Sequence, residues 1–193
     1  MGAVLDSFLV EKNLFLVGGL GRGHSSNVFL VADSRGVKFV AKVERLDSTR
    51  FRMAERESGF LKLANSVGVG PKLFSFDLER RIILMEFVDG VTFDGWLFSN
   101  PGKKALGSFV EELFRQAIAL DGIGLDHGQL AGRGRNILVR GSKPIIIDFE
   151  KASVNRRCHN LSSLQSFLVK NPHSAVSKKV RVILGPGFKR FLP

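Results

Sequence analysis

The stretch from residue 13 to residue 46, NLFLVGGLGRGHSSNVFLVADSRGVKFVAKVERL, constrains the fold more than any other part of the sequence. Its short apolar runs are rich in Val, Phe and Leu, and clusters of Gly, Ser and Asp separate them, which is typical of strands joined by turns. We therefore predict strands at residues 13–18, 27–32 and 37–44, with a hairpin turn at residues 33–36. Because short turns join antiparallel neighbours, this part of the chain is expected to begin an antiparallel sheet.

Further along the chain, helical and strand-like patterns follow one another. Apolar side chains three or four positions apart predict amphipathic helices, and short β-branched runs between turn residues predict strands. The expected elements are helices at 49–65, 103–121 and 160–170, two strands joined at 79–81, and a hairpin of strands at 136–140 and 144–148. The final segment, LGPGFKRFLP, is interrupted by Gly and Pro, and we expect it to be a loosely docked tail.

This order of elements predicts an α+β fold in two lobes. Residues 1–87 would form a β-rich N-terminal lobe with one helix. Residues 88–193 would form a minimal, mainly helical C-terminal lobe that carries the small hairpin, with a hinge near residues 86–90.

Composition narrows the classes of protein that remain. The hydrophobic content of 44% is sufficient for a packed core, and no apolar run approaches the roughly 20 residues of a membrane-spanning helix. The first residues lack a basic leader, so a secretory signal is not expected. Cys158 is the single cysteine, which excludes an internal disulfide and fits a cytoplasmic protein with no membrane partner.

Positive charge is concentrated in the last third of the chain. Residues 1–130 hold 16 basic and 16 acidic side chains, whereas residues 131–193 hold 13 basic and 2 acidic ones. A basic region of this kind attracts polyanions, so RNA or a ribonucleoprotein is a candidate partner for residues 131–193. The alternative is a solvated basic surface that only aids solubility.

The glycine-rich turn after the first strand is a candidate phosphate-binding loop. Gly21, Gly23, Ser26 and Val28 have the spacing of a strand–turn–strand loop in which small residues let backbone N–H groups approach phosphate oxygens, while Val28 would cover a purine. His24 and Ser25 lie at the tip of the same loop. His24 is expected at the surface rather than in catalysis, and glycine-rich hairpins without a ligand are common.

Lys42 is a candidate partner for such phosphates. It lies among apolar neighbours on a predicted strand, where an ammonium is unfavourable unless it is paired. Glu57 on the following helix could pair with it, and Glu55 is the rival acid. The alternative is that Lys42 and Glu57 are both solvated.

Taken in order, several motifs resemble a family. The motifs GRGHSSNV, VAK, ILMEFVDG, DHGQL followed by RNILV, and IIIDFE cover about residues 15–170. Together they are similar to minimal, atypical protein-kinase-like phosphotransferases: an archaeal family of predicted serine/threonine kinases, the RIO kinases and the kinase of the tRNA threonylcarbamoyl-adenosine complex. The resemblance implies a two-lobed protein-kinase-like fold that binds ATP with Mg²⁺ or Mn²⁺ between its lobes.

The resemblance also implies roles for individual residues. Asp148 would hold the metal that bridges the ATP phosphates, and Asn136 would supply a further metal ligand. Lys42 and Glu57 would form the phosphate-binding pair. Residues implied around the adenine are Met85 as gatekeeper, Glu86 and Val88 through their backbone groups, and Ala41 and Ile147 on its faces.

Two departures from the family pattern bear on activity. Gln129 stands where the family has an Asp two residues after the loop His, and a neutral amide cannot accept the substrate proton. Asp126, or the two extra residues that separate Gln129 from Asn136, is a candidate source of another such group, and Arg133 or Arg135 could stabilise phosphate charge. Glu150 replaces the Gly that usually follows Asp-Phe, and could pair with a cation or serve as a second metal ligand.

The expected function is therefore transfer of the γ-phosphoryl group of Mg-ATP to a hydroxyl, with Ser or Thr of an unidentified protein as the favoured acceptor. A small-molecule acceptor is the alternative within this class. The other alternative is an ATP-binding pseudokinase that docks RNA or a ribonucleoprotein.

Overall fold

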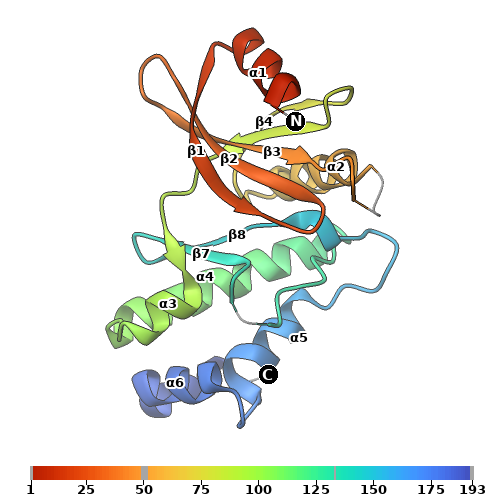
Figure 1. The fold of residues 1–193 in the computed structure, drawn as a ribbon. Helices are drawn as coiled ribbons and strands as arrows, with labels where there is room; N and C mark the ends of the chain where they lie inside the picture. The colour runs from red at the N-terminus through yellow and green to blue at the C-terminus, as the bar shows by residue number, and fades with distance from the viewer. Residues whose placement is uncertain (1, 49–51, 133, 192–193) are drawn as a thin grey trace. The chain divides into compact units, whose positions relative to one another are not determined.

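The computed structural model describes residues 2–48, 52–132 and 134–191, without the side chain of residue 191 (Figure 1). The chain forms two compact units. The first comprises the residues up to Asn65 together with Pro71–Phe87. The second comprises Ser66–Gly70 together with the residues from Val88 onward.

The first unit is a five-stranded antiparallel sheet with two helices. Its strand order is β1-β2-β3-β5-β4, in which β2, β3 and β5 each pair antiparallel with the strand that precedes them in the chain, and a helix is inserted between β3 and β4. The elements are α1 (Gly2–Glu11), β1 (Leu14–Arg22), β2 (Ser26–Asp33), β3 (Lys38–Glu44), α2 (Met53–Ser66), β4 (Leu73–Asp77) and β5 (Ile82–Glu86).

Helix α1 supplies one side of the core of the first unit. Leu5, Phe8 and Leu9 lie on one helical face, because residues three and four positions apart are neighbours on a helix. They pack with Val31 of β2 and Ile82 of β5, both fully buried. This packing explains why so short a helix is stable at all.

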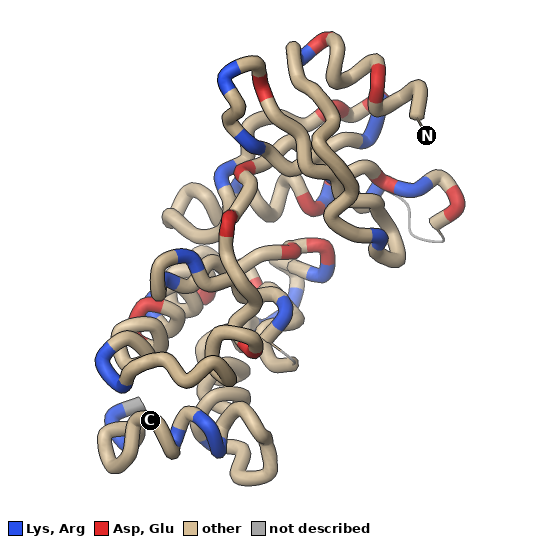
Figure 2. The backbone as a smooth tube through the Cα atoms, turned by 60° about the vertical axis from the view of Figure 1, so that its left-hand side comes forward, with Lys and Arg blue, Asp and Glu red and all other residues tan. Residues whose placement is uncertain are grey.

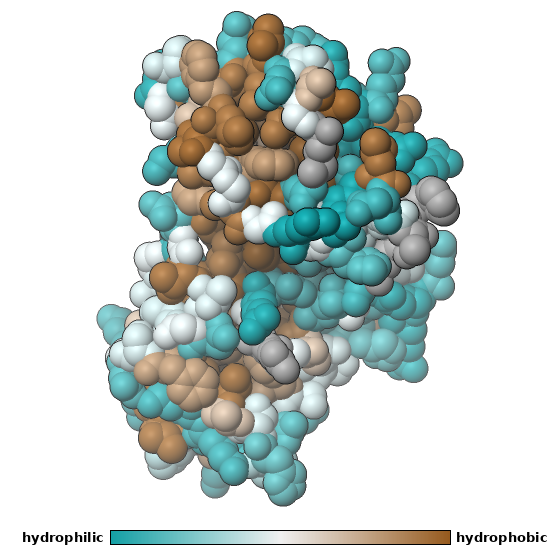
Figure 3. Space-filling model, viewed as in Figure 1, coloured by the Kyte–Doolittle hydropathy of each residue, from teal (hydrophilic) through white to brown (hydrophobic). Residues whose placement is uncertain are grey.

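Strand β1 is the free edge of the sheet and is unusually exposed. Phe15 is 62% exposed and Leu16 is 51% exposed, and Figure 3 shows apolar side chains gathered over this part of the unit. Register shifts between Leu16 and Gly18 and between Gly19 and Gly21 interrupt its pairing with β2. Such bulges twist an edge strand and disfavour its pairing with another chain.

The second unit is mainly helical and contains a three-stranded sheet of order β6-β7-β8. Its long central helix, α4 (Lys103–Gly122), buries Leu106, Phe109, Leu113 and Leu120 completely. The other elements are β6 (Val91–Thr92), α3 (Phe93–Phe98), β7 (Ile137–Arg140), β8 (Lys143–Ile146), the 3₁₀ helix η1 (Phe149–Lys151), α5 (Asn160–Gln165), the π-helical turn η2 (Ser166–Lys170), α6 (Ala175–Leu184) and the 3₁₀ helix η3 (Gly185–Phe191).

Most predicted elements are present, and the α+β class is confirmed. The helix expected over 49–65 is found as α2, although residues 49–51 lie outside the described residues. The sequence patterns did not predict α1, α3, α6 or the short strand β6. The expectation of a loosely docked tail is wrong, because residues 185–191 form η3. In this segment Arg190 pairs with Glu111 at 2.9 Å and Phe188 lies under Arg181.

None of the described helices combines the length and the apolar composition that crossing a membrane requires.

Candidate functional site

The glycine-rich turn between β1 and β2 is closed by contacts within the first unit. The N–H of Gly23 donates to the carbonyl of Ser26 at 2.7 Å, and Arg45 donates from Nη1 to the carbonyl of Gly23 at 3.2 Å. His24 is exposed as expected, whereas Ser25 and Ser26 are buried. The loop therefore offers its backbone and its glycines to a ligand, rather than its serine side chains.

Among the described residues, nothing is packed so closely on Gly21 that a larger side chain would be excluded. A Cβ atom added there would meet nothing within 4 Å, and its φ angle is not in the left-handed region. Gly21 lies opposite Val28 in the β1–β2 pairing, and Val28 is half-buried. Open space above a glycine next to an apolar side chain is suited to the close approach of a flat ligand.

Lys42 and Glu57 form the predicted ion pair. Lys42 Nζ lies 2.7 Å from Glu57 Oε1, and the two side chains are only 10% and 6% exposed. Strand β3 carries Lys42 and helix α2 carries Glu57. The rival acid, Glu55, pairs instead with Arg52 on the outer side of the helix.

Three of the residues expected around an adenine belong to the first unit, with Ala41 on β3 and Met85 and Glu86 at the end of β5, whereas Val88 and Ile147 belong to the second unit, where Ile147 follows β8 and is half-buried. Ala41 is fully buried and pairs with Phe29 of β2 and Leu84 of β5. Met85 is half-buried, and the N–H of Glu86 donates to the carbonyl of Lys72 at 2.8 Å, so this N–H is used within the first unit. Val88 is 6% exposed and is the first residue of the second unit after this strand.

The β7–β8 hairpin brings the backbone of Asn136 beside that of Ile147, the residue before Asp148. Ile137 pairs with Ile146, and the N–H of Ile147 donates to the carbonyl of Asn136 at 2.9 Å. Asn136 precedes β7 and Asp148 follows β8, so both lie at the open end of the hairpin. The side-chain amide of Asn136 also donates to the carbonyl of Gln129 at 3.4 Å. Asn136 is thereby tied both to the strand end and to the loop that precedes it.

Asp148 has a strained backbone. Its φ and ψ angles are 65° and 71°, in the left-handed region that non-glycine residues rarely adopt. This conformation turns the chain sharply from β8 into η1. Carboxylate oxygens of Asp148 and Glu150 come within 4.8 Å of one another, close enough to share a cation. Strain of this kind is often found at functional sites, where the surrounding structure maintains it.

His127 is buried behind this hairpin. Its Nε2 lies 2.9 Å from the carbonyl of Ile147, and its ring meets that of Phe149 edge to face with 4.9 Å between the ring centroids. The backbone N–H of His127 donates to Asn160 Oδ1 at 2.8 Å. Burial lowers the pKa of His127 below its ordinary value, so the neutral ring is favoured, and Nε2 then donates to the carbonyl. His127 thus fixes the position of the residue immediately before Asp148.

Asp126, the candidate for an alternative catalytic group, is buried and bonded within the second unit. Its carboxylate binds Nε of Arg156 and accepts the N–H of His159 at 3.1 Å, and the residue is 5% exposed. Both oxygens therefore have structural partners. Gln129 is half-buried and Arg135 is exposed, while Arg133 lies outside the described residues.

Gly128, between Asp126 and Gln129, is required by the same arrangement. Its φ angle is +78°, and a Cβ atom would lie 2.0 Å from Nη2 of Arg156. Arg156 in turn donates from Nη2 to the carbonyl of Lys151 at 2.6 Å. A glycine at this point leaves room for the guanidinium of Arg156, which bonds both Asp126 of this loop and Lys151 of the segment after Asp148.

Two supporting residues were not identified from the sequence. The side-chain amide of Asn160 donates to Asp121 and to the carbonyl of Leu125, and its oxygen accepts the backbone N–H of His127. Glu44, which is 4% exposed, accepts the N–H of Ala54 at 2.9 Å near the start of α2. The only signal for Glu44 was an acid ending an apolar strand, and Asn160 carried no signal because its partners are far away in the sequence.

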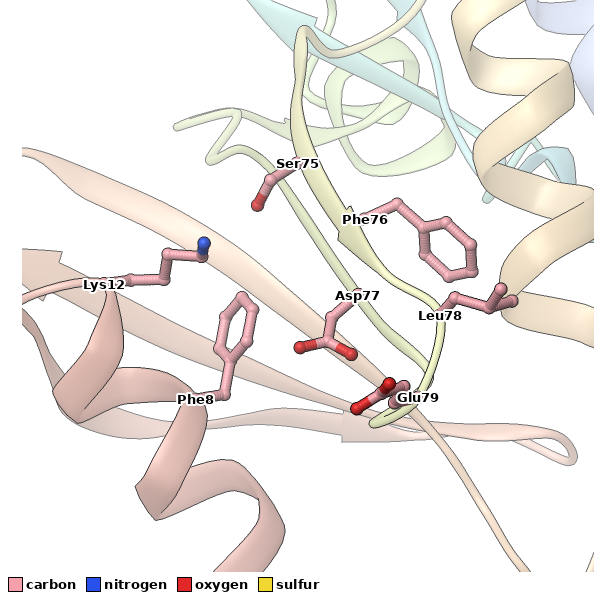
Figure 4. A pocket seen from close by; sticks show the side chains of 7 residues that line it. All are labelled: Phe8, Lys12, Ser75, Phe76, Asp77, Leu78 and Glu79. Atoms are coloured by element: carbon pink, nitrogen blue, oxygen red, sulfur yellow. The ribbon is translucent and has the colours of Figure 1, made fainter.

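A separate hollow of about 330 Å³ lies between the end of α1 and the β4–β5 hairpin and contains none of the predicted site residues (Figure 4). Lys12 at its rim pairs with Glu11 at 3.0 Å, and Asp77 pairs with Arg80 at 2.6 Å. Because these charges have partners within the chain, the hollow is a feature of packing in the first unit.

Comparison with known proteins supports the fold. No protein-family model matches the sequence. The uncharacterized protein MJ1211 of Methanocaldococcus jannaschii is 29% identical over 103 residues, which are 53% of this chain and 85% of that protein. The Rio2 kinase of Chaetomium thermophilum, solved as an ADP/Mg²⁺-phosphoaspartate complex, matches with a TM-score of 0.65 at 21% identity, covering 97% of this chain and 67% of that one.

The identity to the solved structure is low, so the likeness is one of fold. It covers nearly the whole chain, and it agrees with the α+β class expected from the order of motifs. The chain therefore has a protein-kinase-like fold, similar to that of the Rio2 kinase.

Proposed function

We propose that this protein is an ATP-dependent phosphotransferase that moves the γ-phosphoryl group of ATP to a hydroxyl. Lys42, held by Glu57, would contact the phosphates, and the backbone of residues 21–28 would cover them. The adenine would lie against Ala41 and Val28 and bond to the backbone near Glu86. The favoured acceptor is Ser or Thr of a partner protein, with a small-molecule hydroxyl as the alternative.

The buried Lys42–Glu57 pair is the observation that carries this proposal. Holding an ammonium at 10% exposure removes most of its hydration, and the carboxylate of Glu57 compensates for that loss and holds the lysine in one position. In kinases with this fold, the pair between the β3 lysine and a helix glutamate positions the lysine at the nucleotide phosphates. In this chain too, the lysine lies on strand β3 and the glutamate lies on the helix that follows it, α2.

The end of the β7–β8 hairpin fits a magnesium ion by its donor set. Asp148 and Glu150 offer carboxylate oxygens and Asn136 offers an amide oxygen, the ligand types that this cation prefers. When bound, the cation would neutralise charge on the phosphates. The left-handed turn at Asp148 would present its carboxylate beyond the strand, and His127 would hold that turn in place.

A second candidate function follows from Gln129. Because this amide cannot accept a proton, and because Asp126 is engaged with Arg156, no described carboxylate of this loop is in place as a general base. The protein would then bind ATP without transferring its phosphate and act as a pseudokinase. Phosphoryl transfer depends mainly on positioning and on charge stabilisation, so we favour slow catalysis.

Two measurements on the full chain test the proposal. The first is the melting temperature with and without Mg-ATP. The second is the transfer of labelled phosphate from γ-labelled ATP to the protein itself, to a general protein-kinase substrate with Ser and Thr acceptors, and to small hydroxyl compounds. Asp148→Asn is the main variant, since Asn tolerates the left-handed backbone while removing the charge. Lys42→Met is the second, with Lys38→Met on the same strand as its control, because Lys38 is exposed.

We expect Mg-ATP to raise the melting temperature of the parent protein and of Lys38→Met, and to do so much less for Asp148→Asn and Lys42→Met. Labelled phosphate transfer would distinguish an enzyme from a pseudokinase. A parent protein that neither gains stability from Mg-ATP nor transfers phosphate would contradict both candidate functions. The cytoplasmic location and the protein substrate stay predictions of the same proposal.

A further inference from the structure

Helix α2 has two apolar stripes, and the protein covers one of them. Met53, Ala54, Glu57, Ser58, Leu61 and Ala64 are buried. On another face, Phe60 is half-buried and Leu63 is 43% exposed, although both are large and apolar. An ordinary surface helix has a single apolar stripe, whereas in the described part of this chain Phe60 and Leu63 stay partly exposed on a further face.

A groove of about 530 Å³ runs along this second stripe. Five of its lining residues, Glu55, Arg56, Gly59, Phe60 and Leu63, come from α2, and the sixth, Arg52, immediately precedes the helix. They recur at intervals of three or four positions, which places them on one side of the helix. The groove is thus a property of one helix in the first unit.

Gly59 creates the hollow in the middle of the groove. Glycine is among the least favourable residues inside a helix. No described residue requires it, because a Cβ atom at position 59 would meet nothing within 4 Å and its φ angle is not in the left-handed region. A helical glycine without an internal reason is best explained by something that approaches the helix closely from outside.

The rim of the groove carries unbalanced positive charge. Arg52 binds Glu55 through two hydrogen bonds of 2.6 and 2.8 Å, so these charges satisfy each other. Arg56 lies over the ring of Phe60 at 6.0 Å and forms no ion pair with another described residue. An occupant that brings a carboxylate to Arg56 and an apolar side chain to Gly59 would complement the groove.

We propose that this groove is the docking site for an acidic peptide segment of a partner protein, which inserts one apolar side chain between Phe60 and Leu63 over Gly59. The acids on either side of the inserted residue would bind Arg56 and the outer edge of Arg52. The net charge of +11 disfavours a second copy of this chain as the occupant. The proposal does not depend on phosphate transfer.

Synthetic peptides test the proposal directly. The probes are twelve-residue peptides with a central Phe, Trp or Leu flanked by Asp and Glu, compared with the same peptides in which Lys replaces the acids. Affinity is measured by fluorescence anisotropy, and the binding site is mapped by amide chemical shifts of the full ¹⁵N-labelled chain. Gly59→Leu fills the groove and Arg56→Glu reverses its free charge. Gly122→Leu is the matched control, because Gly122 is also helical and also has open space around it.

We expect at least one acidic peptide to bind, to shift amides of α2, and to lose at least tenfold in affinity with Gly59→Leu and with Arg56→Glu, while Gly122→Leu binds normally. Lys-flanked peptides should not bind. Three results would overturn the proposal: no binding by any acidic peptide, binding that Gly59→Leu and Arg56→Glu leave unchanged, or a dimer of the chain that these two variants dissociate. The last result would assign the groove to a second copy.

Discussion

His127 shows how one buried side chain can position a whole turn. Its Nε2 bonds the carbonyl before Asp148, its ring packs on Phe149, and its backbone N–H is held by Asn160. Nδ1 is buried and has no hydrogen-bond partner among the described residues. Protonation would therefore place a charge and a new donor where nothing can accept it.

This arrangement predicts a pH dependence of stability. Burial lowers the pKa of His127 in the folded state, so the unfolded chain, with a histidine pKa of about 6.5, binds the proton more readily. Stability should fall as pH drops from 7 to 5, by up to about 2 kcal/mol from this residue. Urea unfolding at a series of pH values measures it. His127→Gln, which keeps a donor for the carbonyl of Ile147, should flatten the profile, and an unchanged slope would contradict the assignment.

At the scale of the element, helix α2 depends on two polar contacts with β3. Lys42 pairs with Glu57 in the middle of the helix, and Glu44 accepts the N–H of Ala54 in its first turn. A carboxylate in this position satisfies a backbone donor that the helix itself cannot, and it interacts favourably with the positive end of the helix dipole. Both contacts come from one strand, so they fix the helix along its length.

Removing the contact at the helix start should loosen α2. We expect Glu44→Ala to lower the free energy of unfolding by about 1–3 kcal/mol, because the buried N–H of Ala54 loses its acceptor. Glu55→Ala is the control on the same helix, and because its pair with Arg52 is exposed, its loss should lower stability much less. Denaturant unfolding gives both values, and amide exchange should become faster in the first turn of α2. Equal losses for the two variants would count against the role of Glu44.

For the whole molecule, charge is distributed very unevenly along the chain. After Glu150 the chain has basic residues and no acidic ones, and Figure 2 shows basic positions in blue along its C-terminal segment. Some of these side chains are used within the fold. Arg181 donates from Nε to the carbonyl of Val169 at 3.1 Å and lies over Phe188, and Lys179 binds Asn100. Lys178 and Lys189 are exposed.

We expect the chain to bind RNA weakly through this region, with tRNA as the probe. Reversing Lys178 and Lys189 to Glu should weaken binding and lower the slope of log affinity against log salt by about 2, since each phosphate contact contributes about 0.9. Reversing the exposed Lys62 and Lys104 changes the net charge equally outside the region and is the control. If both double variants weaken binding to the same extent, the region has no special role.

The predictability of the site differed from residue to residue. Lys42 could be identified because an ammonium within an apolar strand requires a partner, and the helical pattern offered Glu57. Asp148 was identified because an acid follows a run of β-branched residues. The partner of Asp126 could not be predicted, because nothing in the sequence between positions 126 and 156 indicates that these residues meet.

The sequence by itself determined the order and type of the main strands and helices, because alternation, helical spacing and turn residues are local properties of the chain. It also determined the charge asymmetry and the candidates Lys42, Asn136 and Asp148. Only the tertiary structure decided that α1 is a helix, that residues 185–191 form the 3₁₀ helix η3, and that Asp126 is engaged with Arg156. Each of these depends on contacts with residues distant in the sequence, whose free energy no local pattern contains.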